Sequence, residues 1–206
     1  MVSIRAWLHT NWFYAGLTAG LFLFAIAPLL SGTWSLALIL VFLQLPVYMV
    51  HQIEEHNHDR FRRFVNGHVA GGLDALTPDA ILVTNIGGVW LVDMASLYLA
   101  RFVDPGLGLI AVYLAIFNAL LHIVGALVLR AYNPGLVSAV LLLLPAGCAG
   151  WWILYRSGAC SAADTAVGIG VAIAVHVAII GWIRYRIGRL KRLAGERGST
   201  AAGAVS

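Results

Sequence analysis

The chain has 206 residues, of which 61% are hydrophobic and 11% are charged, and its formal net charge is +4. Soluble domains carry about 45–50% apolar and about 25% charged residues, so this chain has too little charge to cover a water-facing surface of its size. Its basic residues lie at the ends of apolar segments, where they set membrane topology. The composition therefore excludes a soluble domain, a disordered chain and a nucleic-acid-binding module.

Six apolar segments have lengths near the ~20 residues that cross a bilayer as a helix. In chain order they are residues 12–30, 35–50, 80–100, 106–129, 136–155 and 165–183. We predict an all-α fold, an integral membrane bundle of about six transmembrane helices. Residues 1–190 form its single domain, and residues 191–206 form a basic and then flexible cytoplasmic tail.

The basic residues are distributed unevenly between the two sides of such a bundle. With six spans both termini lie on one side, and that side holds eleven of the 13 Lys and Arg residues. The other side holds only Arg101 and Arg156. Because cytoplasmic loops carry an excess of Lys and Arg, both termini are predicted to be cytoplasmic. We expect a multi-pass protein of the bacterial inner (plasma) membrane.

The second span ends in an ionisable run that starts at His51. If the helix continues, each residue turns by about 100°, so that His51, Glu54, Glu55 and His58 share one face and His56 points away. Two carboxylates beside imidazoles at the edge of hydrocarbon are costly unless they are paired or bind a metal. The run is therefore the first candidate site.

Polar residues of three other spans lie at a similar depth. Asn85 is in the third span, Asn118 and His122 are in the fourth, and His176 is in the sixth. Scattered accidents would not be expected to align in this way, so we predict a shared pocket in the cytoplasmic half of the bundle. Its candidate catalytic residues are Glu54, Glu55, Asn85 and Asn118, although such amides also commonly bond across helices.

The motif His51-x-x-Glu54-Glu55 resembles the signature of a family of small multi-pass membrane proteins named for H-x-x-E-E. The later Asn118-x-x-x-His122 and the turn Tyr132-Asn133-Pro134-Gly135 are also similar to that family. The resemblance covers most of the chain up to the fifth span. It implies a site at His51, Glu54 and Glu55 and names no reaction.

The number and spacing of the candidate ligands exclude two kinds of metal site. The chain has too few glutamates for a ferritin-like di-iron centre, and its spacing fits neither H-E-x-x-H nor H-x-x-E-H. A single divalent metal (zinc, iron or manganese) remains feasible, with ligands drawn from His51, Glu54, Glu55, His122 and His176. The spare glutamate would act as general base on water held by the metal. This reading predicts hydrolysis of a lipid-like or isoprenoid-like substrate that enters from the bilayer.

Three alternatives stay open at this point. The Glu54/Glu55 pair could act without a metal as acid and base in an isomerase or cyclase. His122 and His176 could bind haem or a quinone. The intramembrane Glu and His could instead form the relay of a small proton or ion transporter. The expected partners are the lipid bilayer and a hydrophobic small molecule, and a homo-oligomer is compatible with the small size.

Overall fold

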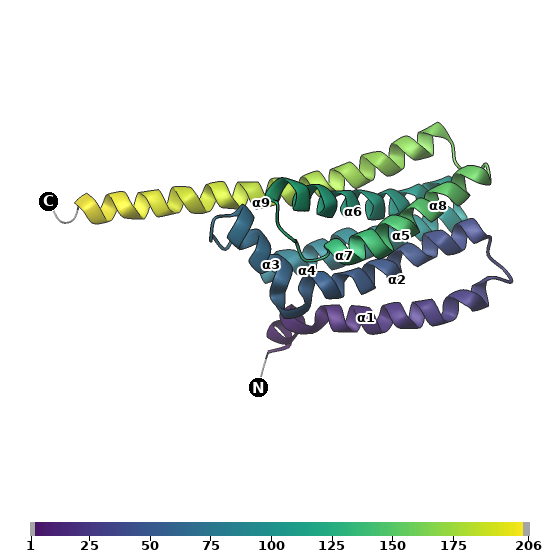
Figure 1. Cartoon of the computed structure of the whole chain (residues 1–206), viewed down its shortest axis with the longest axis horizontal. Coiled ribbons are helices and arrows are strands. Elements are labelled where there is room, and N and C mark those ends of the chain that lie inside the picture. The colour runs from purple at the N-terminus through teal and green to yellow at the C-terminus, as the bar shows by residue number, and fades with distance from the viewer. Residues whose placement is uncertain (1–2, 204–206) are drawn as a thin grey trace.

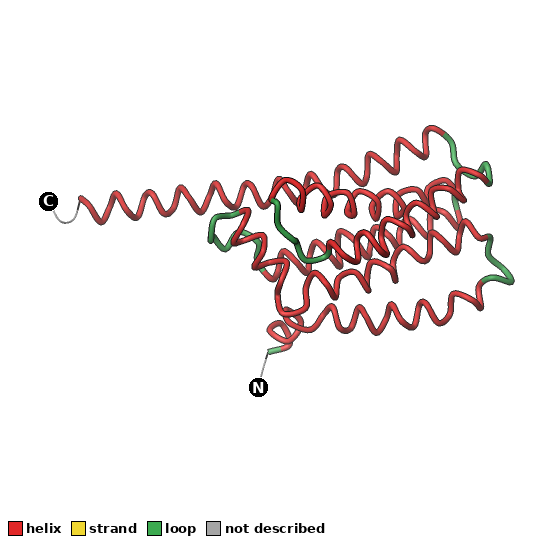
Figure 2. The backbone as a smooth tube through the Cα atoms, viewed as in Figure 1, coloured by secondary structure: helices red, strands yellow, loops and turns green. Residues whose placement is uncertain are grey.

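The computed structural model describes residues 3–203 of the chain, where the regular elements are all helices (Figure 2). Within these residues six helices are long and apolar enough to cross a membrane. They comprise Ile4–Leu30, Leu36–Val69, Pro78–Phe102, Pro105–Leu129, Leu136–Arg156 and Ala162–Glu196. The predicted all-α bundle of six spans is confirmed.

Several of these spans are composite. The first is the single helix α1 (Ile4–Leu30). The second consists of α2 (Leu36–His56), a 3-10 turn (Asn57–Asp59), α3 (Arg60–Phe64) and a π-helical turn (Val65–Val69). The third consists of α4 (Pro78–Leu82), a π-helical stretch (Val83–Trp90) and α5 (Leu91–Phe102). The fourth consists of a 3-10 turn (Pro105–Gly108) and α6 (Leu109–Leu129). The fifth consists of α7 (Leu136–Ser138), a π-helical turn (Ala139–Leu143) and α8 (Leu144–Arg156), and the sixth is α9 (Ala162–Gly203).

Side-chain caps start three of the spans. The hydroxyls of Ser3, Ser35 and Thr77 accept hydrogen bonds from backbone N–H groups in the first turns of α1, α2 and α4. Each cap satisfies a donor that has no partner inside its helix. The spans therefore begin where the local sequence supplies such a residue.

Helices α2 and α6 form the centre of the bundle. Helix α2 packs against α1, α5, α6 and α8, while α6 also packs against α8 and α9. The outer helices expose large apolar side chains, and Phe22, Leu141 and Val177 are each more than 60% exposed. Such a surface is unfavourable in water and fits the hydrocarbon of a bilayer.

The described chain begins and ends at the same end of the bundle, which we call the terminal end (Figure 1). Helix α9 extends beyond the other helices there and is continuous across residues 190 and 191. The predicted domain boundary therefore does not coincide with the end of an element. Flexibility of the tail stays a prediction, as does the side of the membrane on which the termini lie, and residues 204–206 lie outside the described residues.

Candidate metal centre

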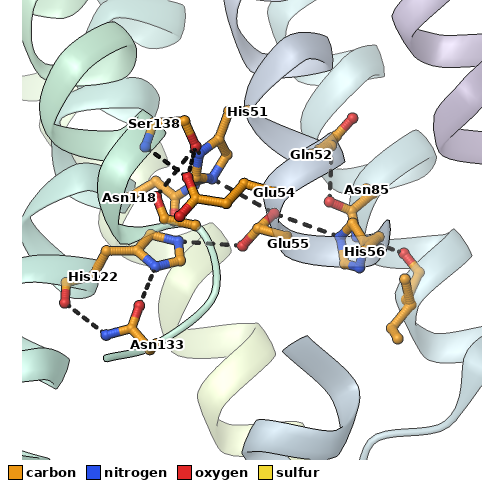
Figure 3. A network of polar contacts seen from close by, with 12 residues as sticks. His51, Gln52, Glu54, Glu55, His56, Asn85, Asn118, His122, Asn133 and Ser138 are labelled. Atoms are coloured by element: carbon orange, nitrogen blue, oxygen red, sulfur yellow. Dashed lines mark hydrogen bonds and ion pairs between the residues drawn. The ribbon is translucent and has the colours of Figure 1, made fainter. Parts of the chain in front are cut away.

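The carboxylate of Glu55 lies among three imidazoles in the bundle interior (Figure 3). Its Oε1 is 3.2 Å from His122 Nε2, and its Oε2 is 3.5 Å from His51 Nε2 and 3.4 Å from His56 Nε2. One ligand atom from each of His51, Glu55 and His122 lies within 4.8 Å of the other two. We refer to these three buried residues as the His/Glu/His group.

Two central helices supply the His/Glu/His group. His51 and Glu55 are four residues apart on α2 and therefore lie on one face of that helix. His122 approaches from α6, which packs against α2. A motif on one helix is thus completed by a residue far along the chain.

The hydrogen bonds of Ser138 determine which nitrogen of His51 carries the proton. The Ser138 hydroxyl donates its single proton to the carboxylate of Glu54. Its oxygen can then only accept from His51 Nδ1, which lies 2.9 Å away. His51 therefore carries its proton on Nδ1, and its Nε2 presents a lone pair to Glu55.

Asn133 orients His122 in the same way. The Asn133 Nδ2 donates to the carbonyl oxygen of His122 at 2.9 Å, which fixes the orientation of the amide. Its Oδ1 therefore faces His122 Nδ1 at 2.6 Å and accepts the proton of that nitrogen. The Nε2 of His122 therefore carries no proton and faces Glu55.

Three acceptors thus converge in a buried space. Two neutral imidazole nitrogens and a carboxylate cannot hydrogen-bond to one another, so this arrangement favours a cation or an added proton among them. The Asn118 amide, with its Nδ2 3.4 Å from His51 Nε2, is a donor at the edge of this space. Metal-ligating histidines usually donate their other ring N–H to a carbonyl, carboxylate or water, which fixes the tautomer and orientation. The donor set and its supporting hydrogen bonds fit a divalent transition metal.

Glu54 has different partners from its neighbour Glu55. Its carboxylate accepts from Tyr132 Oη at 2.5 Å, from the backbone N–H of Val137 at 3.1 Å and from both the N–H and the hydroxyl of Ser138. Val137 and Ser138 are in the first turn of α7, so Glu54 caps the fifth span from α2. Burial and the hydrogen bond to Glu54 raise the pKa of Tyr132 to about 12, so the phenol keeps the proton that it donates.

The backbone at Gly135 passes close to the His/Glu/His group. Its φ of +104° lies in the left-handed region that favours glycine. A Cβ at this position would lie 2.5 Å from His122 Cε1 and 2.9 Å from Glu55 Cγ. The turn therefore needs glycine both for its conformation and for its approach to the site.

A pocket shared by several spans is present, and its place in the cytoplasmic half stays a prediction. A cavity of about 330 Å³ is lined by residues of the second, third, fourth and sixth spans. The predicted site residues on its wall are Glu55, Asn85, Asn118, His122 and His176.

Those residues do not all belong to the His/Glu/His group. Asn118 Nδ2 lies 3.4 Å from His51 Nε2, at the edge of the group. Asn85 accepts from Gln52 Nε2 of α2 and donates to the carbonyl of Ile81 in its own span, so both ends of its amide are engaged. His176 contacts the carbonyl of Ala172 through Nδ1. Glu54 and His176, both expected as candidate ligands, lie outside the group.

The prediction about the face of the motif helix is wrong for two histidines. Helix α2 ends at His56, and His58 and Asp59 adopt left-handed conformations with φ near +56° and +59°. The chain therefore turns before His58 can join the face of His51. His56, expected to point away, is buried against Glu55 and the ring of Trp12.

The sequence interpretation assigned no role to the residues that orient the two imidazoles and bind Glu54. Ser138, Asn133 and Tyr132 come from the connection between the fourth and fifth spans and from the turn that follows it. The Asn133-Pro134-Gly135 turn directly before a span was the available signal. It marks a tight approach of backbone to the bundle, but it does not say which side chain it meets.

The fold and the site define a six-span helical membrane protein with a buried His/Glu/His group. A model of the family described as "Protein of unknown function with HXXEE motif" matches residues 42–150, more than half of the chain, and the chain belongs to this family. No curated protein and no solved structure matches the chain. The matched region includes His51, Glu54, Glu55, His122 and Ser138.

Proposed function

We propose that this protein is a metal-dependent membrane enzyme that acts on a hydrophobic substrate. One observation carries the proposal: His51 Nε2 and His122 Nε2 each lie within 3.5 Å of a Glu55 oxygen, and the hydrogen bonds behind both imidazoles place the ring protons on Nδ1. Three protein ligands and an open position are typical of catalytic zinc sites. Iron and manganese are also compatible with two imidazoles and one carboxylate.

A bound metal would polarise a carbonyl or phosphoryl oxygen and lower the pKa of a water molecule. Glu54 is fully engaged in capping α7, so we assign proton transfer to another residue. His56 lines the cavity, and its buried Nε2 has no hydrogen-bond partner and lies 3.4 Å from Glu55. His56 is the group best placed to exchange a proton with a substrate in the cavity.

The cavity wall supports a hydrophobic substrate. Most of its lining side chains are apolar. Leu121, Leu129 and Ile180 belong to this lining and are also 39–43% exposed on the outer surface of the bundle. A molecule dissolved in the bilayer could therefore enter between α6 and α9 without crossing a polar surface. Metal-dependent hydrolysis of a lipid-like or isoprenoid-like substrate is the reaction class that we favour.

A metal-free acid–base enzyme is the second candidate, because an added proton would also satisfy the three acceptors. In that case Glu55 and its imidazoles would act together, since Glu54 and Glu55 have separate partners and do not form one carboxylate pair. The haem alternative requires the Nε2 of His122 to face His176, whereas this nitrogen faces Glu55.

Elemental analysis of the detergent-purified protein separates the two candidates. We expect close to one equivalent of zinc, iron or manganese per chain, lost in His51→Ala and in His122→Gln and retained in His68→Ala. His68 is an exposed control outside the cavity. Size-exclusion profiles identify variants that fail to fold, and re-addition of metal after chelation tests the site in the unaltered chain. A folded protein that binds none of the three metals after such re-addition would exclude the metalloenzyme.

A further inference from the structure

The cavity has one fixed positive charge on its wall. Arg184 is the sole Arg or Lys among the described residues that line it. Its guanidinium makes no hydrogen bond or ion pair with the described residues, whereas Arg62 binds Asp59 and Asp74 and Arg186 donates to the carbonyl of Asp74. Arg184 therefore has its donors free at the cavity.

The register of α6 against α9 gives the position of Arg184 along the axis of the bundle. A Cβ on Gly168 would lie 2.8 Å from the carbonyl oxygen of Leu109, and the rings of His176 and Phe117 lie 6.5 Å apart. Both pairs are 59 residues apart, so the two helices run parallel and position 181 is level with His122. At 1.5 Å per residue, Arg184 lies about 4.5 Å nearer the terminal end than His122. Arg184 lines the cavity and is also exposed, so its charge is at the mouth of the cavity, about one helical turn or less from the level of His122.

An apolar cavity with a free guanidinium at its mouth matches an amphiphile. The planar fork of Arg binds carboxylate and phosphate oxygens through paired hydrogen bonds. A volume of about 330 Å³ is near the lower end of the range of ligand pockets, which favours one apolar chain over two. Charge and shape together define the ligand class.

We propose that Arg184 binds the oxyanionic headgroup, phosphate or carboxylate, of a single-chain amphiphile whose apolar chain occupies the cavity. That this ligand is the substrate rests on the proposed function. The headgroup then lies at the mouth, and the bonds next to it lie beside His122 and Glu55. The inference assigns Arg184 a binding role and leaves the metal to the His/Glu/His group.

Calorimetric titration of the full-length protein in phosphatidylcholine nanodiscs tests this assignment. The probes are dodecylphosphonate, dodecanoate and uncharged dodecanol, each with a C12 chain. Arg184→Gln is compared with Arg189→Gln, which removes an exposed charge from the same helix outside the cavity. We expect Arg184→Gln to raise the Kd of the tighter oxyanion by about tenfold or more, as for a lost charge-assisted hydrogen bond. Arg189→Gln leaves this Kd unchanged, and Arg184→Lys falls between the two.

The tighter of the two oxyanions identifies the headgroup as phosphate-like or carboxylate. Equal effects of Arg184→Gln and Arg189→Gln, or dodecanol binding as tightly as both anions, would overturn the inference. Metal content is measured on the same samples. If Arg184→Gln leaves the Kd unchanged in a protein that retains metal, only the headgroup assignment is wrong. If Arg184→Gln raises the Kd in a protein that cannot bind metal, only the metalloenzyme proposal is wrong.

Discussion

Two buried carboxylates of this bundle have opposite surroundings. Glu55 on α2 is 5% exposed and has three imidazole nitrogens within 3.5 Å. Asp93 on α5 is 2% exposed, and neither of its oxygens has a hydrogen-bond partner among the described residues. Both are acids within apolar spans, but α2 itself places His51 and His56 beside Glu55, whereas α5 brings no partner to Asp93 among the described residues.

Neighbouring helices add to this difference between the two carboxylates. Around Glu55, α6 contributes His122, and the start of the fifth span fixes the orientation of His51. One turn from Asp93, Ser96 donates to the carbonyl of Leu107 and accepts from the N–H of Ala111, so its hydroxyl is committed elsewhere. An isolated carboxylate in such surroundings is far less costly as the neutral acid. We therefore expect Asp93 to carry a proton and Glu55 to require a cation.

The largest expected effect is the loss of metal in Glu55→Gln. Removing the only carboxylate of the His/Glu/His group should lower metal affinity by more than about 100-fold, because loss of a supporting partner alone costs about 10–100-fold. Asp93→Asn makes the same chemical change in the other buried acid and should leave metal affinity unchanged. Competition with a chelator of known affinity measures the metal affinity of both variants. Similar losses of affinity in both would contradict the different roles of Glu55 and Asp93.

A smaller effect is expected when the orienting serine is removed. Ser138→Ala leaves His51 Nδ1 without its partner and deprives Glu54 of one donor, so metal affinity should fall by about 10–100-fold. Ser96→Ala is the matched control beside Asp93, because it also removes a hydroxyl that makes two hydrogen bonds. It should lower thermal stability without changing metal affinity, and a metal effect of equal size would show that Ser138 acts only through stability.

Glycine substitutions test the packing of the site against its backbone. Gly135→Ala adds a methyl group against His122 in a left-handed turn, and Gly71→Ala adds one in a left-handed turn with no atom within 4 Å. Both should cost roughly 1–2 kcal/mol of unfolding free energy for the backbone conformation. Gly135→Ala should cost a further 1–3 kcal/mol or so for overpacking and should also weaken metal binding. Denaturation midpoints of the two variants in detergent would coincide if the turn did not contact the site.

The smallest effect is expected for the stability of Asp93→Asn. A neutral acid and an amide have nearly the same shape, so the unfolding free energy should change by less than about 1.5 kcal/mol. A large gain in the thermal midpoint would mean that wild-type Asp93 is ionised and that Asn relieves a buried charge. Asp93 and Glu55 would then differ in their partners but not in their charge.

Much of the fold follows directly from the sequence. Long apolar runs without charges must satisfy their backbone groups internally in a bilayer, so they form helices, and their number follows from their length. The 100° turn per residue also puts His51 and Glu55 on one face, as predicted. The same rule fails at His58, because it holds only while the helix continues and α2 ends at His56.

The separate roles of Glu54 and Glu55 needed the tertiary structure. Adjacent residues on a helix point about 100° apart, so each carboxylate meets a different neighbour: Glu55 meets α6 and Glu54 meets the start of α7. Nothing in the local pattern specifies which helix packs on which face. Ser138 and Asn133 were missed for the same reason, since their roles depend on contacts with residues that are distant in the chain.

The sequence by itself determined the class of the protein, its six spans and the motif on which its site is built, because hydrophobicity and helical periodicity are local properties. Only the tertiary structure decided which acid joins the imidazoles, which nitrogen of each imidazole faces the centre and which arginine reaches the cavity. These depend on the packing of α2, α6, α7 and α9 against one another, and hydrogen-bond direction and helix register exist only once those helices have met.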